Sequence, residues 1–371
     1  MRTLGEAARW YDAWLREAAL PLWAGAGVDP ANGLFQEALS TDGAPHEAPR
    51  RLRAQARQVF VLASAANAGY GARWLAIARA GYARLSELYR RPDGLFIYLV
   101  SADGQPLDET IGVYEQAFAL LAMAGLHAAD PAGEALPREA RRTLDAMGER
   151  HVGAGGYRES GPQPYQANCH MHLLESALAW EETGVPGWAA VSDELAELAL
   201  TKFIDPATGV LREFFDSDWR PLSGEAGLIE PGHHFEWGWL LERWGRSRGD
   251  SRARTTARRL FDNGLLGVDL GREVAVNALW EDFSVRDGAA RLWPQTEYLK
   301  AALIFDEPEH ALRAARGLSR YLETPARGAW RDKLQPDGRF LDEPSPATSF
   351  YHLYLAVAAL RQAAGRPAGG N

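Results

Sequence analysis

The feature that most constrains this chain is a turn-rich segment that recurs along its length. Glycines anchor the copies at positions 33, 94, 156, 209 and 328, which are 61, 62, 53 and 119 residues apart. The last interval is two periods, so a further copy is expected near Gly271. A period of about 60 residues divides the 371-residue chain six times, and such regular self-similarity indicates a repeat architecture.

Each repeat carries two kinds of helical pattern. The stretch after each turn is rich in Ala, Leu and Trp, as in residues 173–180, and a helix that is apolar on most sides is a buried one. The stretch before the turn is amphipathic and belongs to an outer ring, for example at residues 74–89, 190–203, 252–266 and 308–322. Alternating apolar residues, as at 95–100 before Asp103 and Gly104, indicate short hairpins.

These patterns predict an all-α fold, namely an (α/α)6 barrel: a toroid of six inner and six outer helices with short β-hairpins in the loops. A single catalytic domain is expected to span residues 1–371. An open superhelix of helix pairs is the alternative. The closed ring accounts better for the strongly buried set, because the concave helices of a superhelix would show a more polar face.

Composition narrows the class of partner. The formal net charge of −9 argues against nucleic acid, whose binding depends on Lys and Arg contacts with phosphates. The first residues lack the apolar core of a signal peptide, and no apolar run reaches the ~20 residues of a membrane span. Cys169 is the single cysteine, so no intrachain disulfide can form. We expect a cytoplasmic protein without membrane or nucleic-acid contacts, either a monomer or a homodimer.

Polar and ionisable residues cluster in the first turns of the expected inner helices. If these helices run parallel, as alternation requires, the clusters converge on one mouth of the barrel and predict an active-site pocket there. The residues are Arg53, Gln55, Arg57, Tyr114, Gln116, Asn168, His172, His233, Glu236, Gln295, Glu297 and His352.

Three histidines of this set, His172, His233 and His352, are the catalytic candidates. An unperturbed imidazole titrates near pH ~6.5, so it can both take and return a proton near neutrality. His233 and Glu236 are three residues apart on one helix face, so Glu236 is expected to orient His233. The neighbouring His170 and His234 are expected to point elsewhere.

Three other interpretations use the same residues. A zinc site would draw on His170, His172, His233, His234 and Glu236, but the spacing matches no His-Glu-x-x-His motif, so we expect neither a metal nor another cofactor. A glycoside hydrolase would use two carboxylates, Glu236 and Glu297, and leave the histidines unexplained. A non-catalytic sugar-binding module would need the aromatic residues alone.

The motifs, taken in order, resemble the N-acylglucosamine 2-epimerase superfamily, and within it the D-mannose isomerase branch most. They read RLRAQARQV at 51–59, NCHMHLLE at 168–175, PGHHFEW at 231–237, RLWPQTE at 291–297 and SFYH at 349–352. The resemblance implies an (α/α)6 barrel and metal-free acid/base catalysis by His233 and His352. It also implies ring opening at His172 and substrate contacts at Arg57, Tyr114, Asn168, Glu236 and Trp293.

The expected reaction is the interconversion of D-mannose and D-fructose through a cis-enediol(ate), with a sugar 2-epimerase as the alternative outcome on the same fold. Arg57 has a fixed charge and planar donors, which suit the enediolate oxygens. Arg53, Gln295 and Glu297 complete the predicted substrate-binding set. The cellobiose enzymes of the family carry a tryptophan five residues before the last histidine, whereas this chain has Ala347, which argues against disaccharide stacking there.

Overall fold

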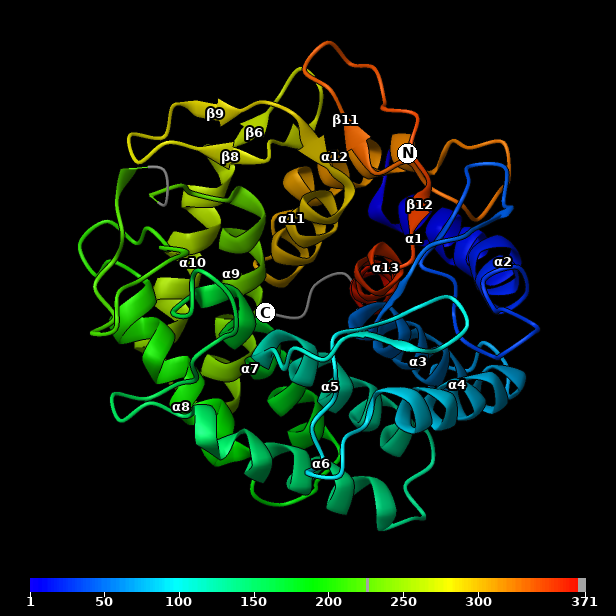
Figure 1. Cartoon of the computed structure of the whole chain (residues 1–371). Coiled ribbons are helices and arrows are strands. Elements are labelled where there is room, and N and C mark those ends of the chain that lie inside the picture. The colour runs from blue at the N-terminus through cyan, green and yellow to red at the C-terminus, as the bar shows by residue number, and fades with distance from the viewer. Residues whose placement is uncertain (225–226, 366–371) are drawn as a thin grey trace.

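Two concentric rings of helices form the protein in the computed structural model, which describes residues 1–224 and 227–365 (Figure 1). The inner ring consists of α3 (Leu52–Asn67), α5 (Val113–Ala129), α7 (Ala167–Glu182), α9 (Pro231–Arg248), α11 (Leu292–Ile304) and α13 (Ser349–Ala364). The outer ring consists of α1 (Leu4–Trp14), α2 (Leu20–Ala24), α4 (Arg73–Tyr89), α6 (Ala135–Ala146), α8 (Ala189–Leu198), α10 (Ser251–Leu265) and α12 (Pro308–Ser319). The predicted (α/α)6 barrel is confirmed, with the first outer position shared by α1 and α2.

Contacts between the two ends of the chain close both rings. In the inner ring α13 packs against α3, and in the outer ring α1 packs against α12 and α13. The Tyr11 hydroxyl donates to the Ala315 carbonyl at 2.7 Å, and Arg57 Nη1 donates to the Thr348 carbonyl at 3.1 Å. An open superhelix would leave its first and last helices apart, so that alternative is excluded.

The hydrophobic core fills the space between the rings, and small residues allow the close packing. Helix α5 is buried along nearly its whole length, which fits its run of Ala, Leu, Met and Phe. A Cβ on Gly125 of α5 would lie 2.9 Å from the Phe60 ring of α3, so glycine permits this inner-ring contact. The outer helices are amphipathic. Asp250 directly precedes α10 and caps it, because its side chain accepts a hydrogen bond from the Ala253 amide.

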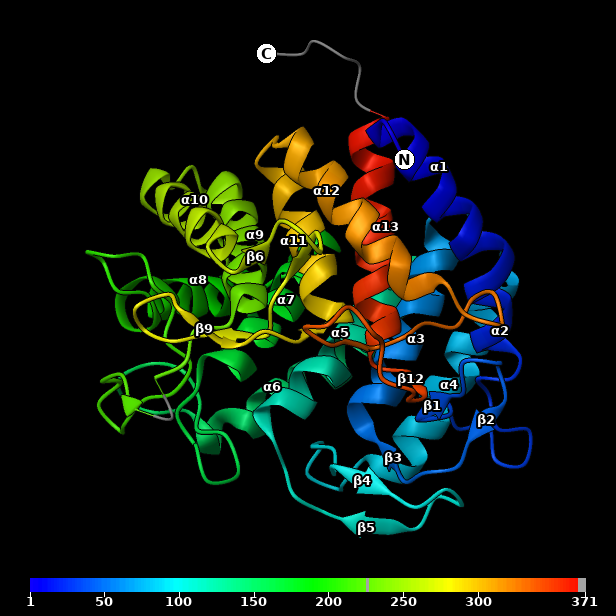
Figure 2. The ribbon, with the colours of Figure 1, turned by 90° about the horizontal axis from the view of Figure 1, so that it is seen from above.

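Short antiparallel strands gather at one end of the barrel, where the inner helices begin, while the last turns of α13 lie at the opposite end (Figure 2). The strands are β1 (Ala38–Leu39), β2 (Pro45–His46), β3 (Arg50–Arg51), β4 (Leu99–Val100), β5 (Pro106–Asp108), β6 (Val268–Asp269), β7 (Val274–Ala275), β8 (Ala278–Leu279), β9 (Val285–Asp287), β10 (Ala290–Arg291), β11 (Lys333–Leu334) and β12 (Ser345–Pro346). The hairpin expected from residues 95–100 exists, but only Leu99 and Val100 of that run form a strand, and they pair with β5.

The fifth turn corrects the expected glycine near Gly271. The left-handed position of this turn is held by Glu273, with φ 58°, whereas Gly33, Gly94 and Gly209 hold it elsewhere with φ between 72° and 97°. Arg316 forms an ion pair with the Glu273 carboxylate. Over the described residues, no helix is long and apolar enough to cross a membrane.

Candidate active site

A hydrogen-bonded clamp fixes each of the six turns to the barrel. In every repeat a side chain accepts a hydrogen bond from the backbone amide of one turn residue. Glutamine serves in three repeats, histidine in two and serine in one: Gln55 on Phe35, Gln116 on Phe96, His170 on Tyr157, His234 on Leu211, Gln295 on Ala275 and Ser345 on Trp330. The glutamines and the serine also donate to the carbonyl of the same residue.

The clamp position explains which polar residues face the barrel axis. Residues two apart on a helix point about 200° away from each other. Arg57, His172, Glu236 and Glu297 each follow a clamp residue by two, so they point inward while the clamp points outward to the turn. In the sixth repeat Ser345, which precedes α13, provides the clamp, and α13 directs His352 into the barrel.

This geometry corrects the predicted placement of three glutamines in the pocket. Gln295 was expected to bind substrate, but its amide is bound to the Ala275 backbone and to the Arg291 carbonyl, and it does not line the pocket. Gln55 and Gln116, which share its place in the other repeats, are clamps as well. His170 and His234 point away from the axis, as expected, and each accepts a backbone hydrogen bond through Nε2.

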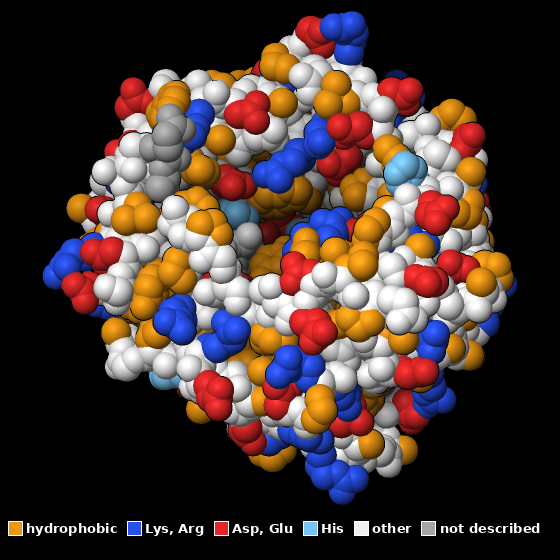
Figure 3. Space-filling view, in the orientation of Figure 1, with side chains coloured by type: hydrophobic (Ala, Val, Ile, Leu, Met, Phe, Trp, Pro, Cys, Tyr) orange, Lys and Arg blue, Asp and Glu red, His pale blue; other side chains and the backbone are white. Residues whose placement is uncertain are grey.

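A cavity of about 590 Å³ opens at the mouth where the strands gather, and Figure 3 shows it as the central hollow of that face. It brings together nine of the predicted residues: Arg53, Arg57, Tyr114, Asn168, His172, His233, Glu236, Trp293 and His352. Its wall also contains Tyr98, Asp108, Thr110, Glu115, Glu159, Ser160, Glu230, Arg291 and Thr348. Glu297 does not line the cavity and instead lies behind His352.

His233 faces two carboxylates. Its Nδ1 lies 2.9 Å from Glu213 Oε2 and 4.0 Å from Glu230 Oε2. Burial favours the neutral imidazole, but the negative charges of Glu213 and Glu230 prevail and raise the pKa of His233 to about 10. The expectation that Glu236 orients His233 is wrong, because Glu213 from the preceding turn segment holds that role. At neutral pH His233 is therefore an imidazolium.

His352 has the opposite protonation. Its Nδ1 lies 2.9 Å from Glu297 Oε1, and Glu297 Oε2 lies 2.6 Å from the Lys300 ammonium. Burial, together with the positive charges of Arg57 and Lys300, lowers the pKa of His352 well below its usual value. Since Nδ1 donates to Glu297, the unprotonated nitrogen is Nε2, and this imidazole is a base. Trp293 lies beside both histidines, with its ring centroid 5.1 Å from that of His233 and 5.8 Å from that of His352.

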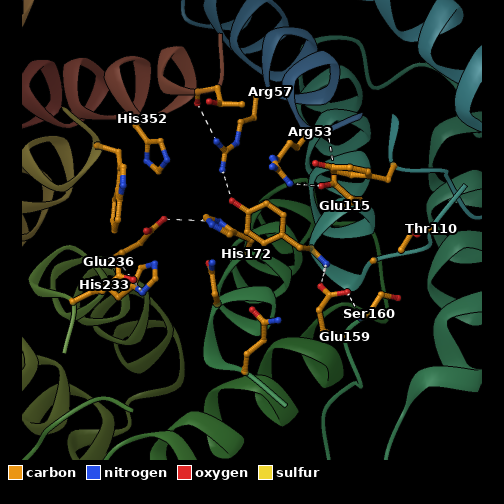
Figure 4. A pocket seen from close by; sticks show the side chains of 18 of the residues that line it. Arg53, Arg57, Thr110, Glu115, Glu159, Ser160, His172, His233, Glu236 and His352 are labelled. Atoms are coloured by element: carbon orange, nitrogen blue, oxygen red, sulfur yellow. Dashed lines mark hydrogen bonds and ion pairs between the residues drawn. The ribbon is translucent and has the colours of Figure 1, made fainter. Parts of the chain in front are cut away.

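His172 lies at the floor of the pocket. Its Nδ1 is 3.4 Å from Glu175 Oε2 and 3.8 Å from Glu236 Oε1 (Figure 4). Burial lowers the pKa of His172 to about 4, so the ring is neutral. Tyr351 donates its hydroxyl to the same Glu175 oxygen. Burial and the nearby carboxylates Glu297 and Glu175 raise the pKa of Glu236 well above its usual value, which favours its acid form.

These buried groups balance in charge. With Glu236 in its acid form, two carboxylates remain, Glu175 and Glu297. The Lys300 ammonium acts on both of them, and the Arg57 guanidinium acts on the neighbouring His352. Such a balance is required where desolvation makes an uncompensated charge very unfavourable. It leaves His172 and His352 neutral at the floor of the site, while His233 at the rim carries a proton.

Arg53 and Arg57 lie on the side of the pocket opposite His233 and His352 (Figure 4). Arg57 donates to the Tyr114 hydroxyl at 2.9 Å, and its guanidinium carbon lies 4.0 Å from the Phe118 ring centroid. Arg53 is paired with Glu115 at 2.6 Å. Asn168 Oδ1 and Glu236 Oε1 are buried and accept no hydrogen bond from any described residue. An unsatisfied buried acceptor costs about 1–3 kcal/mol, so these atoms are well suited to sugar hydroxyls.

Sequence reasoning missed Glu213, Glu175 and Lys300, and for Glu213 a signal existed. The residue two places after each clamped turn residue is acidic, an amide or a tyrosine: Glu37, Tyr98, Glu159, Glu213, Asn277 and Asp332. Four of these receive hydrogen bonds at the start of an inner helix, such as Glu159 from the Val113 and Tyr114 amides. Glu175 and Lys300 carry no such pattern, because each acts from the third turn of a buried helix.

The five residues weighed above for a zinc site do not come together, because His170 and His234 point away from the pocket and bind the turns as clamps. Two other groups place donor atoms within 4.8 Å of one another: His172, Glu175 and Glu236, and Glu236, Glu297 and His352. Both share Glu236 and adjoin the Lys300 ammonium, whose positive charge already compensates the carboxylates. Metal independence stays a prediction, tested by chelation below.

Residues 33–356 match the sequence profile of the family described as N-acylglucosamine 2-epimerase (GlcNAc 2-epimerase). The chain belongs to this family. A relative from Rhizobium meliloti (strain 1021) named "Mannose-6-phosphate isomerase" is 44% identical in an alignment of length 367 that covers 93% of this chain and 94% of the relative. The family therefore makes this chain a sugar isomerase or epimerase.

Solved structures of family members share the barrel. Cellobiose 2-epimerase from Spirochaeta thermophila DSM 6192 matches with a TM-score of 0.87 and 25% identity over 97% of both chains. A D-mannose isomerase matches with a TM-score of 0.85 and 19% identity over 95% of this chain and 97% of the other. Isomerases and epimerases are thus equally similar in fold, so the reaction must be argued from the site.

Proposed function

We propose that the protein is an aldose–ketose isomerase that interconverts D-mannose and D-fructose through a cis-enediol(ate). The observation that supports this most is the pair of histidines beside Trp293 with opposite protonation: His352 is neutral and His233 is charged. Titratable groups whose environments push their pKa values apart are suited to separate base and acid roles. The name of the 44% identical relative points to the same class of reaction.

Ring opening requires one proton to reach the ring oxygen and one to leave the anomeric hydroxyl. His172 directs Nδ1 to Glu175, so its unprotonated Nε2 is the acceptor for the anomeric proton. Glu236 lines the cavity in its acid form and is the donor to the ring oxygen. His172 thus takes the acceptor role in the ring opening that the family resemblance implies for it.

Isomerisation then needs two balanced proton exchanges. His352 Nε2 takes the proton from C2, while the His233 imidazolium gives one to the carbonyl oxygen at C1, which yields the enediol. His352 next returns its proton to C1, and His233 recovers one from the hydroxyl at C2, which yields the ketose. Arg57 stabilises the negative charge that develops on the two oxygens.

The charges of the cavity favour a free sugar over a sugar phosphate. Asp108, Glu115, Glu159 and Glu230 line it, against Arg53, Arg57, Arg291 and the His233 imidazolium. Arg53 is paired with Glu115, Arg291 lies 3.2 Å from Glu230, and His233 lies 2.9 Å from Glu213. Arg57 is bound to two uncharged groups, the Thr348 carbonyl and the Tyr114 hydroxyl. A phosphate is held best by several unpaired cations, whereas three of these four are paired with carboxylates.

The alternatives fit the site less well. A 2-epimerase must return the proton to C2 from the opposite face, so its base and acid would both have to act at C2. A glycoside hydrolase needs two carboxylates flanking the scissile bond. Glu297, one of the two candidates, is fully buried behind His352 and paired with Lys300, so it cannot reach a substrate.

Product analysis tests the proposal. The protein is incubated with D-mannose, D-mannose 6-phosphate, N-acetylglucosamine and cellobiose, and the products are identified by chromatography and NMR. We expect D-fructose from D-mannose, with D-lyxose as a weaker second substrate and little conversion of the phosphate. His352→Asn serves as the matched inactive control. Formation of D-glucose without D-fructose would establish an epimerase instead.

A further inference from the structure

A second cavity, of about 880 Å³, lies at the other end of the barrel, among the last turns of the inner helices. Glu175 and Lys300 line it, whereas His172, Glu236 and His352 line the first cavity. One layer of side chains therefore separates the two cavities. Across that layer runs a continuous chain of contacts: Lys300 Nζ to Glu297 Oε2 at 2.6 Å, then Glu297 Oε1 to His352 Nδ1 at 2.9 Å.

Lys300 is unusual in this chain. The sequence contains three lysines among its 40 Lys and Arg residues, and the other two, Lys202 and Lys333, are exposed or half-buried. Lys300 has no exposed surface and lies with its ammonium 4.2 Å from the Trp239 ring centroid. A compact ammonium differs from a guanidinium in presenting a point charge, which one carboxylate oxygen can accept.

We propose that Lys300 is a positioning residue for the base His352. Its ammonium holds one oxygen of Glu297, so that the other oxygen accepts a hydrogen bond from His352 Nδ1. The ammonium also supplies positive charge that balances the buried carboxylates. This inference rests on the proposed function, in which His352 Nε2 abstracts the C2 proton. Lys300 itself is separated from the substrate by Glu297 and His352.

The charges around His352 determine what the loss of Lys300 would do. The groups that face it come from five inner helices: Arg57 on α3, His172 and Glu175 on α7, Glu236 on α9, Glu297 and Lys300 on α11, and Tyr351 on α13. Without the ammonium, Glu175, Glu236 and Glu297 lose the positive charge of Lys300, which acts on all three. The excess negative charge favours a proton on His352, so the pKa of His352 rises and the base is lost at a higher pH.

The test uses Lys300→Ala, whose truncation leaves space that is open to the second cavity. We expect kcat/KM for D-mannose to fall on the acid side of its pH profile, because the acid limb should move up by ~1–3 units, as for a nearby charge removed. Propylammonium, which replaces the lost atoms, is expected to restore activity and the acid limb. Propan-1-ol, of the same shape without charge, is expected not to.

Matched variants separate positioning from a merely structural role. Arg243→Met removes a cation that lines the same cavity but is paired with Glu182, and it should leave the acid limb unchanged. If the alanine variant does not fold, Lys300→Met is used instead, because methionine is an unbranched, uncharged side chain of similar length that keeps the packing. It should show the same shift of the acid limb. An unshifted acid limb in a folded Lys300 variant, or equal rescue by propan-1-ol, would overturn the inference.

A readout without turnover keeps this inference distinct from the proposed function. NMR titration of ¹⁵N-labelled imidazoles in the substrate-free protein reports the pKa of His352 directly. It should rise in Lys300→Ala and return with propylammonium. If wild type converts no sugar but this titration behaves as expected, the proposed function fails while the role of Lys300 stands. If wild type isomerises mannose but the pKa of His352 does not change in Lys300→Ala, the proposed function stands and the role of Lys300 fails.

Discussion

His352 Nδ1 lies 2.9 Å from Glu297 Oε1, the same distance that separates His233 Nδ1 from Glu213 Oε2, yet the first imidazole is neutral and the second is positively charged. Glu297 shares its charge with Lys300, and Arg57 also faces His352. Among the residues that the structure describes, no lysine or arginine forms an ion pair with Glu213, and Glu230 adds a second negative charge beside His233. The same local pair therefore produces a base in one repeat and an acid in another, because its surroundings differ.

The first prediction concerns these two histidines. His352→Asn and His233→Asn should lower kcat by about 10²–10⁴, the usual cost of removing a general acid or base, with little change in the KM for D-mannose. Circular dichroism and thermal unfolding should match the wild type. His46→Asn, which replaces an exposed histidine, is the control and should keep full activity. Turnover within a few-fold of wild type in both variants would refute the proposed mechanism.

The second prediction is a bell-shaped pH dependence of kcat/KM. The base His352 is lost only when pH falls well below 6.5, and the acid His233 is lost when pH rises past about 10. Glu213→Gln removes a negative charge and so lowers the pKa of His233, which should move the alkaline limb toward neutrality. Glu194→Gln, beside the exposed His151, is the matched control and should not shift it. An alkaline limb unmoved by Glu213→Gln would show that His233 is not the acid.

Much of the fold followed from the sequence because the turn repeat is periodic. Gly33, Gly94 and Gly209 occupy left-handed turn positions that few other residues tolerate, so they mark the repeat directly. Where Glu273 replaces the glycine, the same signal pointed two residues away, to Gly271. The burial contrast between inner and outer helices completed the prediction of two rings.

The site was harder to predict, because residues in one register can face opposite ways. Gln295 and Glu297 are both polar and near a helix start, but the 200° between them sends one to the turn and the other toward the axis. The partners of the histidines come from other segments: Glu213 lies 20 residues before His233, and Glu297 lies 55 residues before His352. Contacts of that kind depend on the closed ring.

The third prediction concerns metal ions. Lys300 already supplies positive charge to the carboxylates of both candidate metal groups, so activity should survive exhaustive chelation. The measurement is kcat for D-mannose before and after dialysis against EDTA, with the metal content checked by mass spectrometry. A chelated sample that loses activity and regains it with zinc or manganese would show that one of these groups binds a catalytic ion.

The last prediction concerns the clamps and acid stability. Burial lowers the pKa of His170 and of His234 to about 4, so both are neutral in the folded protein and accept a backbone hydrogen bond through Nε2. The unfolded chain protonates the same histidines near pH ~6.5. Between these values the unfolded state binds more protons, so stability is full above pH ~6.5 and is lost as pH falls toward 4. Each histidine should therefore lower the free energy of unfolding by about 2 kcal/mol when the pH falls from 7 to 5.

Glutamine makes the same clamp in three other repeats without a titratable group, so His170→Gln and His234→Gln should fold normally. Each substitution should reduce, by about 2 kcal/mol, the free energy of unfolding that the wild type loses between pH 7 and pH 5. The two effects should add, because the sites lie in different repeats. Urea unfolding at both pH values gives the measurement, with His46→Gln as the exposed control. His170→Ala should instead destabilise at every pH by about 1–3 kcal/mol, since the Tyr157 amide loses its acceptor. A glutamine variant as acid-sensitive as wild type would show that the clamp histidines do not set the acid limit of the fold.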